Sequence, residues 1–459
     1  MPGIVYWFRG IVQINCTLNR LFVNLTNQIN TMKKHLLTIL GILSIVTYAQ
    51  DFHRCYTQQA MEHVEESNPG YLDRVNEIFE RAKLVDGQNR DEVYTIPVVV
   101  HIVYDTDEKN LPDSVIYNQI ETLNADFRRL NEDAENVRDT FNTIVGDTHI
   151  QFALASIDPD GNPTTGITRT ETTVESFFDF ETIAENVKAT SEGGIDPWDQ
   201  EHYLNIWVCD MSIFGFVNIL GYATPPDGLE HWPADATAGL SDGVVVQYQV
   251  FGSNNPIPLD IGGTAYDVRG RTLTHEVGHY LGLRHIWGDG DCAAEDGVDD
   301  TPNADAQSEQ DCDDTKNTCV DDILELGDLP DMIENFMDYS AESCQNSFTL
   351  GQIEIMRGVL EIERFELVNG GAEAGIFETS MSGPEFQLYP NPASGPTRLT
   401  FQKPGDYTVN VFDETGKQIK TTHINDQTSE IIFNELSAGF YLIRVTSQEG
   451  IRTEKLIIQ

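Results

Sequence analysis

Basic residues are scarce in this chain of 459 residues. Lysine and arginine number 28 against 74 aspartates and glutamates, which gives a formal net charge of −46. Such a charge repels phosphate groups, which argues against nucleic acid or an anionic membrane surface as a partner. Long apolar runs are also missing, because the run 36–46 is too short for a membrane-spanning helix. The acidic excess is typical of an extracellular protein that stays soluble by self-repulsion.

The first 92 residues divide into three parts. Residues 1–31 do not resemble a secretion signal, and we expect them to be an upstream extension of a chain that starts at Met32. Residues 32–49 have the form of a signal peptide, with two lysines, an apolar run and a plausible cleavage site before Gln50. Residues 50–92 are charged and helical in pattern, which predicts a pro-segment.

One stretch in the second half of the chain reads H-E-x-x-H followed by x-x-G-x-x-H. On a helix, His275 and His279 lie four residues apart and share one face. Gly282 can adopt a left-handed conformation, so the chain can turn back and bring His285 to the same point. Asp267 is the expected N-cap of this helix. The opposite face repeats apolar residues at helical spacing: Leu273, Val277, Tyr280 and Leu281.

Three imidazoles that converge on one point suit zinc, with a fourth position left for water. Zinc lowers the pKa of that water towards about 7, and Glu276 lies where a general base takes its proton. The shorter H-E-x-x-H pattern also fits an amphipathic helix with two exposed histidines. The added glycine and third histidine disfavour that alternative.

A methionine turn is expected downstream of such a motif, and residues 335–339 (NFMDY) fit it. Met337 would form a hydrophobic floor beneath the metal, and Tyr339 would reach the site and stabilise the oxyanion. The alternative for Met337 is ordinary core packing.

These features resemble the pappalysin family of metzincin metallopeptidases, and in particular its ulilysin-like bacterial branch. The resemblance runs from about Tyr94 to Leu367. It implies an α+β fold with a metzincin-type catalytic domain over residues 93–367, in which helices pack on a twisted mixed sheet. The resemblance is carried by the stretches 275–289, 296–302, 335–339, 344, 348–352, 96–101, 203–209 and 220–224.

A strand is expected at Leu220–Thr224. The family resemblance implies that it is the edge strand above the active-site cleft, where an extended peptide substrate binds through main-chain hydrogen bonds. The alternative is an ordinary sheet strand. Apolar patterns predict further strands at 94–104, 150–157, 203–211 and 243–251, and a helix at 116–130.

Four cysteines lie in the acidic segment that follows the zinc motif. In an exported protein they predict two disulfides, and the sequence by itself leaves three pairings open. The resemblance implies Cys292–Cys319 and Cys312–Cys344. Cys209 lies in a predicted strand and is expected to be a buried free thiol.

The same acidic segment resembles the calcium-binding loop of the family. The residues that match it are Asp296, Asp299, Asp300 and Thr301. Calcium prefers carboxylate and carbonyl oxygens, so we expect a structural calcium ion here. A solvated acidic loop is the alternative.

The pair Arg54 and Cys55 resembles the cysteine switch of pappalysin-like zymogens. A thiolate is a strong zinc ligand and can occupy the position that water needs, which makes Cys55 a candidate ligand in the latent form. A thiol with no role is the alternative. A cut in the polar stretch near Arg90 is expected to release full activity.

Residues 368–383 form a linker rich in Gly, Ala and Ser, and residues 384–459 predict a small all-β sandwich. The stretches 388–392, 438–441 and 455–458 resemble the C-terminal sorting module of type IX secretion. That resemblance implies export from a Gram-negative cell, with the secretion machinery as a partner. A sugar- or protein-binding module is the alternative. The expected strands are 398–401, 407–412, 430–433, 440–445 and 454–458.

Together these features predict a secreted zinc endopeptidase that cleaves protein or peptide substrates and is made in a latent form. The alternative from another class is a surface adhesin that keeps a structural zinc. Some members of the family select Arg or Lys just after the scissile bond with an acidic residue near the last of these cysteines. Here Ser343 immediately precedes Cys344 and Glu342 comes one residue earlier, so the position of the acid stays open. The acidic surroundings still favour basic peptides.

Overall fold

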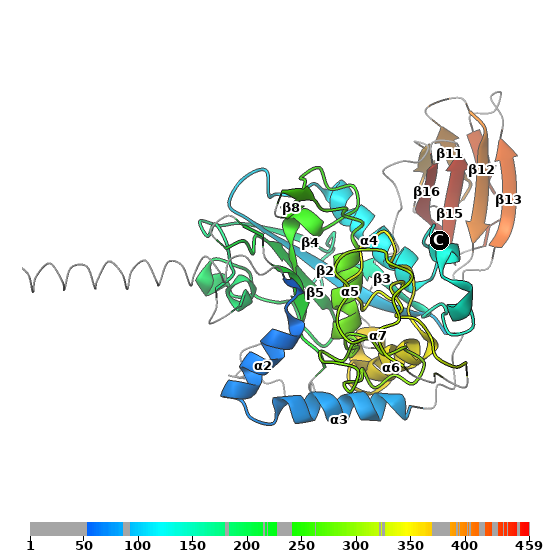
Figure 1. The fold of residues 1–459 in the computed structure, drawn as a ribbon. Helices are drawn as coiled ribbons and strands as arrows, with labels where there is room; N and C mark the ends of the chain where they lie inside the picture. The colour runs from blue at the N-terminus through cyan, green and yellow to red at the C-terminus, as the bar shows by residue number, and fades with distance from the viewer. Residues whose placement is uncertain are drawn as a thin grey trace, which may run out of the picture. The chain divides into compact units, whose positions relative to one another are not determined.

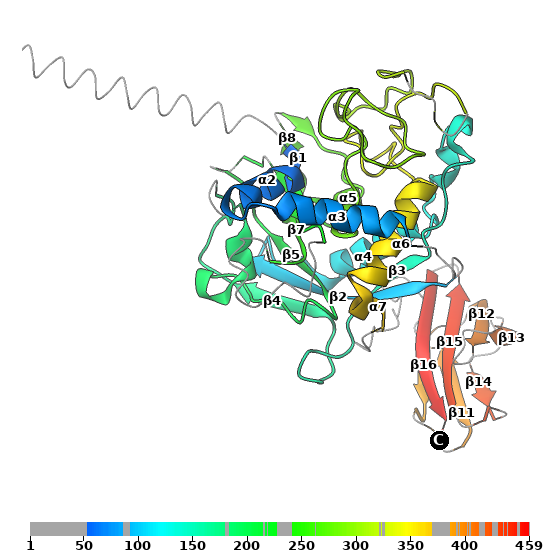
Figure 2. The ribbon, with the colours of Figure 1, turned by 90° about the horizontal axis from the view of Figure 1, so that it is seen from below.

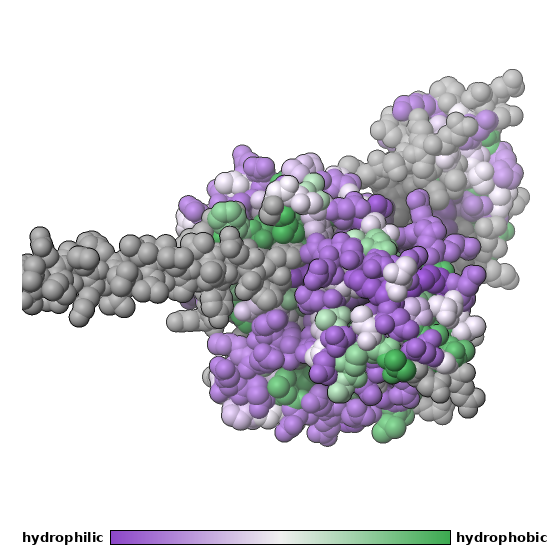
Figure 3. All heavy atoms as spheres, in the orientation of Figure 1, coloured by the Kyte–Doolittle hydropathy of each residue, from purple (hydrophilic) through white to green (hydrophobic). Residues whose placement is uncertain are grey.

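The computed structural model describes residues 53–85, 92–179, 183–213, 216–217, 219–226, 241–261, 263–320, 323, 326–369 and, with short gaps, 386–458. The expected signal peptide 32–49, the cut near Arg90 and most of the linker 368–383 lie outside these residues. None of the described helices is long and apolar enough to cross a membrane. Hydrophilic side chains dominate the described surface seen in Figure 3, as the acidic composition predicts.

A mixed sheet organises the first part of the chain (Figure 1). Strand β2 is central and pairs in parallel with β3, β4 and β5, and its residues 96–103 are all buried. Such continuous apolar runs are typical of parallel strands that are covered on both faces. β5 pairs in parallel with β7, and β6 runs antiparallel to β7.

The strand order is β1-β6-β7-β5-β2-β3, with β4 pairing β2. The bounds are His53–Cys55 (β1), Tyr94–Tyr104 (β2), Ile150–Leu154 (β3), Ile167–Glu171 (β4), Leu204–Cys209 (β5), Ile219–Ala223 (β6) and Val244–Gln247 (β7). A separate two-stranded sheet joins β8 (Asp260–Ile261) to β9 (Thr264–Ala265). The strands expected from sequence are thus present: β2 has its expected bounds, β3, β5 and β7 are shorter than expected, and β6 begins and ends one residue earlier.

Helices α4 (Asp113–Phe127) and α5 (Arg271–Tyr280) pack against each other, α4 also against β3 and α5 against β7. Every residue of α5 is buried, because the sheet and α4 lie on one side and the segment before α6 lies on the other. Helix α6 (Leu350–Ile362) begins with a capping box in which Thr349 and Gln352 exchange hydrogen bonds. α7 (Phe365–Asn369) follows it. Short 3-10 turns lie at Ala134–Asn136, Asp139–Phe141, Glu185–Lys188, Thr190–Glu192 and Tyr248–Val250.

The N-terminal segment contains β1 and two helices, α2 (Thr57–Ser67) and α3 (Tyr71–Lys83). Gly70, at φ +94, makes the turn between the helices. α3 lies beside α6 in both ribbon views (Figures 1 and 2).

Between α5 and α6 the described residues form neither helix nor strand. Two disulfides hold this long irregular segment, Cys292–Cys319 and Cys312–Cys344, with Cα separations of 5.5 and 5.9 Å. They are the two pairs that the family resemblance implied. Cys209 is a buried free thiol in β5, as expected.

The C-terminal residues fold into two sheets that share one core. One sheet has the order β10-β11-β14 and the other β13-β12-β15-β16. Phe386 and Leu399 of the first sheet belong to the same buried cluster as Val409 and Ile443 of the second, which makes a β-sandwich. β10 and β13 were not expected from sequence. The bounds are Phe386–Tyr389, Thr397–Phe401, Tyr407–Phe412, Gln418–Ile424, Glu430–Phe433, Gly439–Ser447 and Gly450–Ile458.

Candidate active site

Three histidine side chains converge at the end of α5. Nε2 of His279 lies 3.2 Å from Nε2 of His275 and 3.1 Å from Nε2 of His285. α5 supplies the first two histidines, one turn apart on the same face. Gly282, at φ +93, then reverses the chain so that His285 returns to the same point.

Each of these imidazoles is held by a hydrogen bond at its other ring nitrogen. The three Nδ1 atoms bond to Phe336 O at 2.7 Å, Leu283 O at 2.8 Å and Asp289 Oδ1 at 2.6 Å. Such bonds assign the proton to Nδ1 and leave the Nε2 lone pair free to bind a metal. Burial lowers the pKa of His275 and lowers that of His279 to about 3, so both rings are neutral.

The spacing and chemistry of this set fit zinc. Nitrogen ligands of a tetrahedral zinc, at about 2.0–2.1 Å from the metal, lie about 3.3 Å apart, which is close to both Nε2 separations. Cys55 joins the cluster, since one ligand atom from each of the four residues lies within 4.8 Å of the others. Three imidazole nitrogens and a sulfur are a donor set that zinc accepts.

Glu276 lies among these groups with its carboxylate buried. Oε1 has no hydrogen-bond partner among the described residues, and Oε2 accepts bonds from Cys55 Sγ at 3.3 Å and Thr57 Oγ1 at 3.2 Å. Burial raises the pKa of Glu276 to about 8. A Cβ at Gly221 would lie 2.9 Å from Cγ of Glu276. Glycine therefore lets β6 pass this close to the carboxylate.

Met337 packs against the turn of α5 that carries both helical histidines. A Cβ at Gly278 would come within 2.4 Å of Sδ of Met337, so the sulfur occupies the space that this glycine leaves. The backbone N–H of Met337 donates to Oδ1 of Asn335 at 2.9 Å, and Nδ2 of Asn335 donates to Oε1 of Gln352 at 2.9 Å. α6 thereby fixes the turn beneath the histidines.

Tyr339 packs against two of the imidazoles. Its ring centroid is 5.6 Å from that of His275 and 5.0 Å from that of His285, and its hydroxyl donates to the carbonyl of Cys55 at 3.2 Å. Trp287 stacks on His285, with centroids 4.3 Å apart, and touches Tyr339 at 4.8 Å. Sequence reasoning assigned no role to Trp287 or to Thr57. The only sequence signal for Trp287 is an aromatic residue two positions after the third histidine.

Residues 54–57 fill the space in front of these groups. The backbone N–H of Tyr56 donates to the carbonyl of Gly221 at 3.0 Å, and Ala223 N–H donates to Oγ1 of Thr57 at 2.9 Å. β1 is accordingly the neighbour of β6 in the sheet. The N-terminal segment therefore lies along the strand that the family resemblance reserves for substrate.

Arg54 is fully buried in an acidic pocket beside the site. Its guanidinium donates to the carbonyl of Ser340 and to Oε1 of Gln345, the latter at 2.7 Å. Nη2 also lies 3.7 Å from Oε1 of the buried Glu342. The pocket thus holds an acid two residues before Cys344, one place earlier than the position that Ser343 occupies.

The N-cap predicted for α5 was wrong. The helix begins at Arg271, after Gly270 at φ +79, while Asp267 is exposed and pairs with Arg269 at 3.0 Å. Oε2 of Glu342 accepts the N–H of Arg271 at 3.2 Å instead. An acid brought in by the tertiary fold takes the capping role of a local one.

The expected calcium loop brings two carboxylates into the interior. Oδ2 of Asp296 and Oδ1 of Asp300 are buried and have no hydrogen-bond partner among the described residues. Burial raises the pKa of Asp296 to about 8 and also raises that of Asp300. Thr301 is buried beside them, but the side chain of Asp299 is exposed and lies 3.8 Å from Nζ of Lys83. The carboxylate of Asp299 is therefore not part of the buried group.

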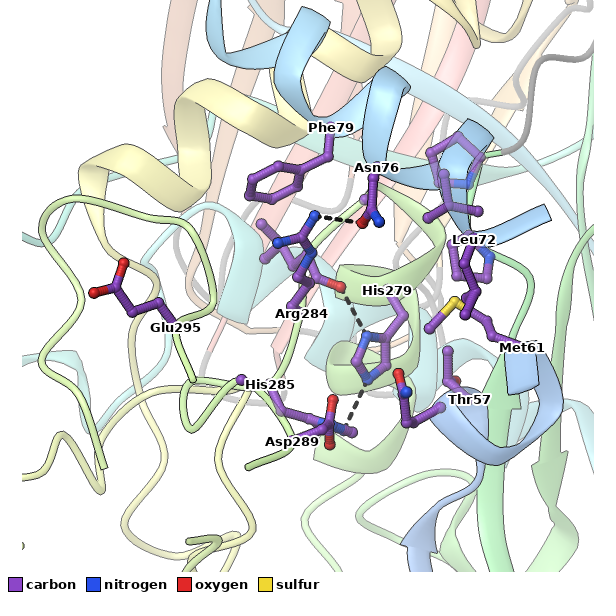
Figure 4. A pocket seen from close by; sticks show the side chains of 17 residues that line it. Thr57, Met61, Leu72, Asn76, Phe79, His279, Arg284, His285, Asp289 and Glu295 are labelled. Carbon is purple, nitrogen blue, oxygen red and sulfur yellow. Dashed lines mark hydrogen bonds and ion pairs between the residues drawn. The ribbon is translucent and has the colours of Figure 1, made fainter. Parts of the chain in front are cut away.

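A cavity of about 230 Å³ opens onto the histidines (Figure 4). His279, His285 and Asp289 line one wall, and Thr57, Leu72 and Phe79 of the N-terminal helices are among the residues that line the other.

Comparisons with known proteins agree with this geometry. The family model described as "Pregnancy-associated plasma protein-A", for the peptidase M43 group, matches residues 191–361. A model described as "Secretion system C-terminal sorting domain" matches residues 387–459. An extracellular metalloprotease of Arthroderma gypseum is 25% identical over 293 residues, which cover 62% of this chain and 79% of the relative.

Two solved structures from Tannerella forsythia are similar. Mature mirolysin in complex with a cleaved peptide is 38% identical with a TM-score of 0.52, over 61% of this chain and 99% of that one. A mutant of promirolysin is 35% identical with a TM-score of 0.58, over 70% of this chain and 100% of that one. The match to promirolysin covers more of this chain than the match to the mature form does.

Proposed function

This chain belongs to the pappalysin family of metallopeptidases, and on that premise we propose that it is a zinc-dependent endopeptidase made as a latent zymogen. Its C-terminal domain is a type IX sorting domain, so the peptidase is exported through that secretion machinery. The observation that carries the proposal is Glu276, buried with a free Oε1, beside three imidazole nitrogens spaced for zinc.

His275, His279 and His285 would hold the metal. Bound zinc supplies a Lewis acid that polarises a peptide carbonyl and lowers the pKa of water. The Nδ1 hydrogen bonds hold the three rings in a fixed orientation before any metal arrives, which reduces the cost of assembling the site.

An extended peptide takes the place of residues 54–57 along β6, through main-chain hydrogen bonds to Gly221 and its neighbours. Glu276 takes a proton from the attacking water on its carboxylate and passes that proton to the nitrogen of the leaving amine. The close approach of Gly221 to Glu276 supports this role, because it brings the scissile bond of a β6-bound peptide next to the carboxylate.

Tyr339 donates a hydrogen bond to the oxygen of the scissile carbonyl as negative charge develops there. Its present acceptor supports this role. In the latent form the phenol donates to the backbone carbonyl of Cys55, a peptide carbonyl held within the site at 3.2 Å. The substrate carbonyl would replace that of Cys55.

Latency comes from Cys55, whose sulfur would occupy the fourth ligand position of the metal. The same thiol and Thr57 also bond to Oε2 of Glu276, at 3.3 and 3.2 Å, so the general base is engaged as well. One short segment thereby blocks the metal, the base and the substrate strand together.

The Arg54 pocket supports a preference for basic substrate residues. A buried guanidinium already lies there, within reach of Glu342 and Gln345, and a substrate Arg or Lys would make the same contacts after the pro-segment leaves. Glu342 would then serve as the acid of this pocket, although it lies one residue earlier in the chain than Ser343. Cleavage profiling on a peptide library tests this, and a preference for apolar residues on the primed side would reject it.

The loop of Asp296 and Asp300 would bind calcium, with Thr301 beside it. Two buried carboxylate oxygens without partners are costly unless a cation neutralises them, and oxygen donors suit calcium. Asp299 can contribute only through its backbone, because its side chain is exposed.

A surface adhesin with a structural zinc is the competing function, and a closed site of three histidines and Cys55 would suit it. The buried and partly unpaired Glu276 has no use in such a protein. The deciding experiment compares processed wild type with Glu276→Ala and His285→Ala, using casein cleavage and zinc content. We expect Glu276→Ala to keep zinc and lose cleavage, and His285→Ala to lose zinc. Full activity of zinc-loaded Glu276→Ala would refute the mechanism.

A further inference from the structure

Helix α3 is bound to the rest of the protein far more extensively than the blocking of the site requires. Tyr71, Ile78, Phe79 and Ala82 are buried along one side of it. A Cβ at Gly358 of α6 would lie 2.4 Å from the carbonyl oxygen of Ala82, so the two helices touch backbone to backbone at that point. The contact depends on a glycine in the middle of α6, where glycine weakens the helix itself.

Charged and aromatic contacts extend along the same helix. Arg284 lies with its guanidinium 3.9 Å from the ring centroid of Phe79 and donates to Oδ1 of Asn76 at 2.8 Å (Figure 4). Arg81 pairs with Glu363 at 2.9 Å. Lys83 donates to the carbonyl of Gly297 at 2.5 Å. The surface that receives α3 is therefore made by Arg284, Gly297, Gly358 and Glu363, which we call the α3 site.

All these contacts, and those of residues 54–57, involve residues of the N-terminal segment before residue 85. A cut in the stretch 86–91, near Arg90, severs the covalent connection to β2 but removes none of them. The sequence-based expectation that such a cut releases full activity therefore conflicts with the packing of α3.

We propose that the α3 site is a binding site for the severed pro-segment, which stays bound as a separate chain and keeps the active site blocked. This inference rests on the proposed latency of the peptidase. α3 acts as the anchor, and residues 54–57 act as the plug that the anchor holds at high local concentration.

Release then requires a second cut, between anchor and plug. The turn 67–70 between α2 and α3 offers it, since Ser67 and Pro69 are exposed and Gly70 has a left-handed backbone. After that cut the plug and α2 are no longer tethered to α3 and dissociate as a short peptide.

The test uses the full chain with the recognition sequence of a highly specific protease in place of residues 86–91. In a Glu276→Gln background, which prevents self-cleavage, the cut protein is passed over a size-exclusion column. We expect the severed pro-segment to co-elute with the catalytic part. Phe79→Ala and Arg81→Ala should each raise the ratio of free to co-eluting pro-segment, by at least tenfold for Phe79→Ala. Glu77→Ala, on the exposed side of α3, should leave this ratio unchanged. Arg81→Ala leaves the buried apolar residues of α3 in place, so it still tests the α3 site if Phe79→Ala fails to fold.

A second arm keeps Glu276 and measures the rate on a quenched peptide. A protein cut only within residues 86–91 should stay at least tenfold less active than one cut both there and at an inserted site in the turn 67–70. Separate elution of the pro-segment, or activity that rises in proportion to the cut within residues 86–91, would overturn the proposal. The co-elution arm needs no enzymatic activity, so it tests the α3 site independently of the peptidase function. A doubly cut protein that binds metal and is still inactive would count against the peptidase function and not against the α3 site.

Discussion

Replacing Tyr339 with Phe tests the site most directly, because it removes one oxygen and keeps the ring. The ring packs on His285 and Trp287, with centroids 5.0 and 4.8 Å away, and phenylalanine would keep these contacts beside the metal site. The lost group is the hydroxyl that now donates to the carbonyl of Cys55 at 3.2 Å. If that carbonyl stands for the scissile one, the variant lacks a donor to the developing oxyanion.

Two effects of this change oppose each other in the latent form. Loss of an oxyanion donor typically lowers kcat by about 10²–10³-fold, or about 2.7–4 kcal/mol. Loss of the hydrogen bond to Cys55 weakens the closed state by about 1 kcal/mol, which raises the open population by about fivefold. The first effect is larger, so we expect Tyr339→Phe to have less residual activity than wild type before processing, and about 10²–10³-fold lower kcat after it.

The assay measures kcat and KM of the fully processed enzyme on a quenched peptide, together with its zinc content and melting temperature. Tyr203→Phe is the matched control, since its hydroxyl also donates to a backbone carbonyl, that of Ile157 at 3.0 Å, in another part of the structure. Both variants should lose a similar small amount of stability, and only Tyr339→Phe should lose kcat. A kcat within about threefold of wild type, with zinc bound, would refute the role of Tyr339.

Four further changes have defined outcomes. Gly221→Ala places a Cβ 2.9 Å from Cγ of Glu276, so kcat should fall at least tenfold with zinc retained; unchanged kinetics would mean that β6 does not constrain the base. Cys55→Ala should make the unprocessed form measurably active on a short peptide, and a rate equal to the wild-type precursor would assign latency to bulk blockage. A calcium-selective chelator should lower the melting temperature by about 2–4 °C per kcal/mol of binding lost, with zinc retained, and an identical melting curve would exclude the calcium site. A chain that ends before residue 384 should stay inside its native cell, and its normal export would disprove the sorting role.

Local patterns were enough to predict that the three histidines converge. The spacing of His275 and His279 follows from the helical repeat, and Gly282 with φ +93 explains how His285 joins them. The strand β2 was predicted with its observed bounds for a similar reason, since a long β-branched run is typical of a strand buried on both faces. These properties depend on residues within one element or turn.

Features that depend on distant segments were missed or left open. The cap of α5 comes from Glu342, 71 residues away, and Asp267 is exposed instead. Thr57 reaches Glu276 across 219 residues of sequence, and no pattern near either residue indicates the contact. The sequence alone allowed three disulfide pairings, and the fold forms one of them.

The sequence by itself therefore determined that three imidazoles and a carboxylate of the right types and local spacing come together, whereas Cys55 was indicated only by the family resemblance. Only the tertiary structure decided how that chemistry is controlled. Three features depend on contacts between distant segments: the exposure of the Asp299 side chain, the acidic pocket around Arg54 and the packing of α3 against Gly358. Periodicity records the direction in which a side chain faces within its own element, but contact between elements is set by packing of the whole core, which no local pattern encodes.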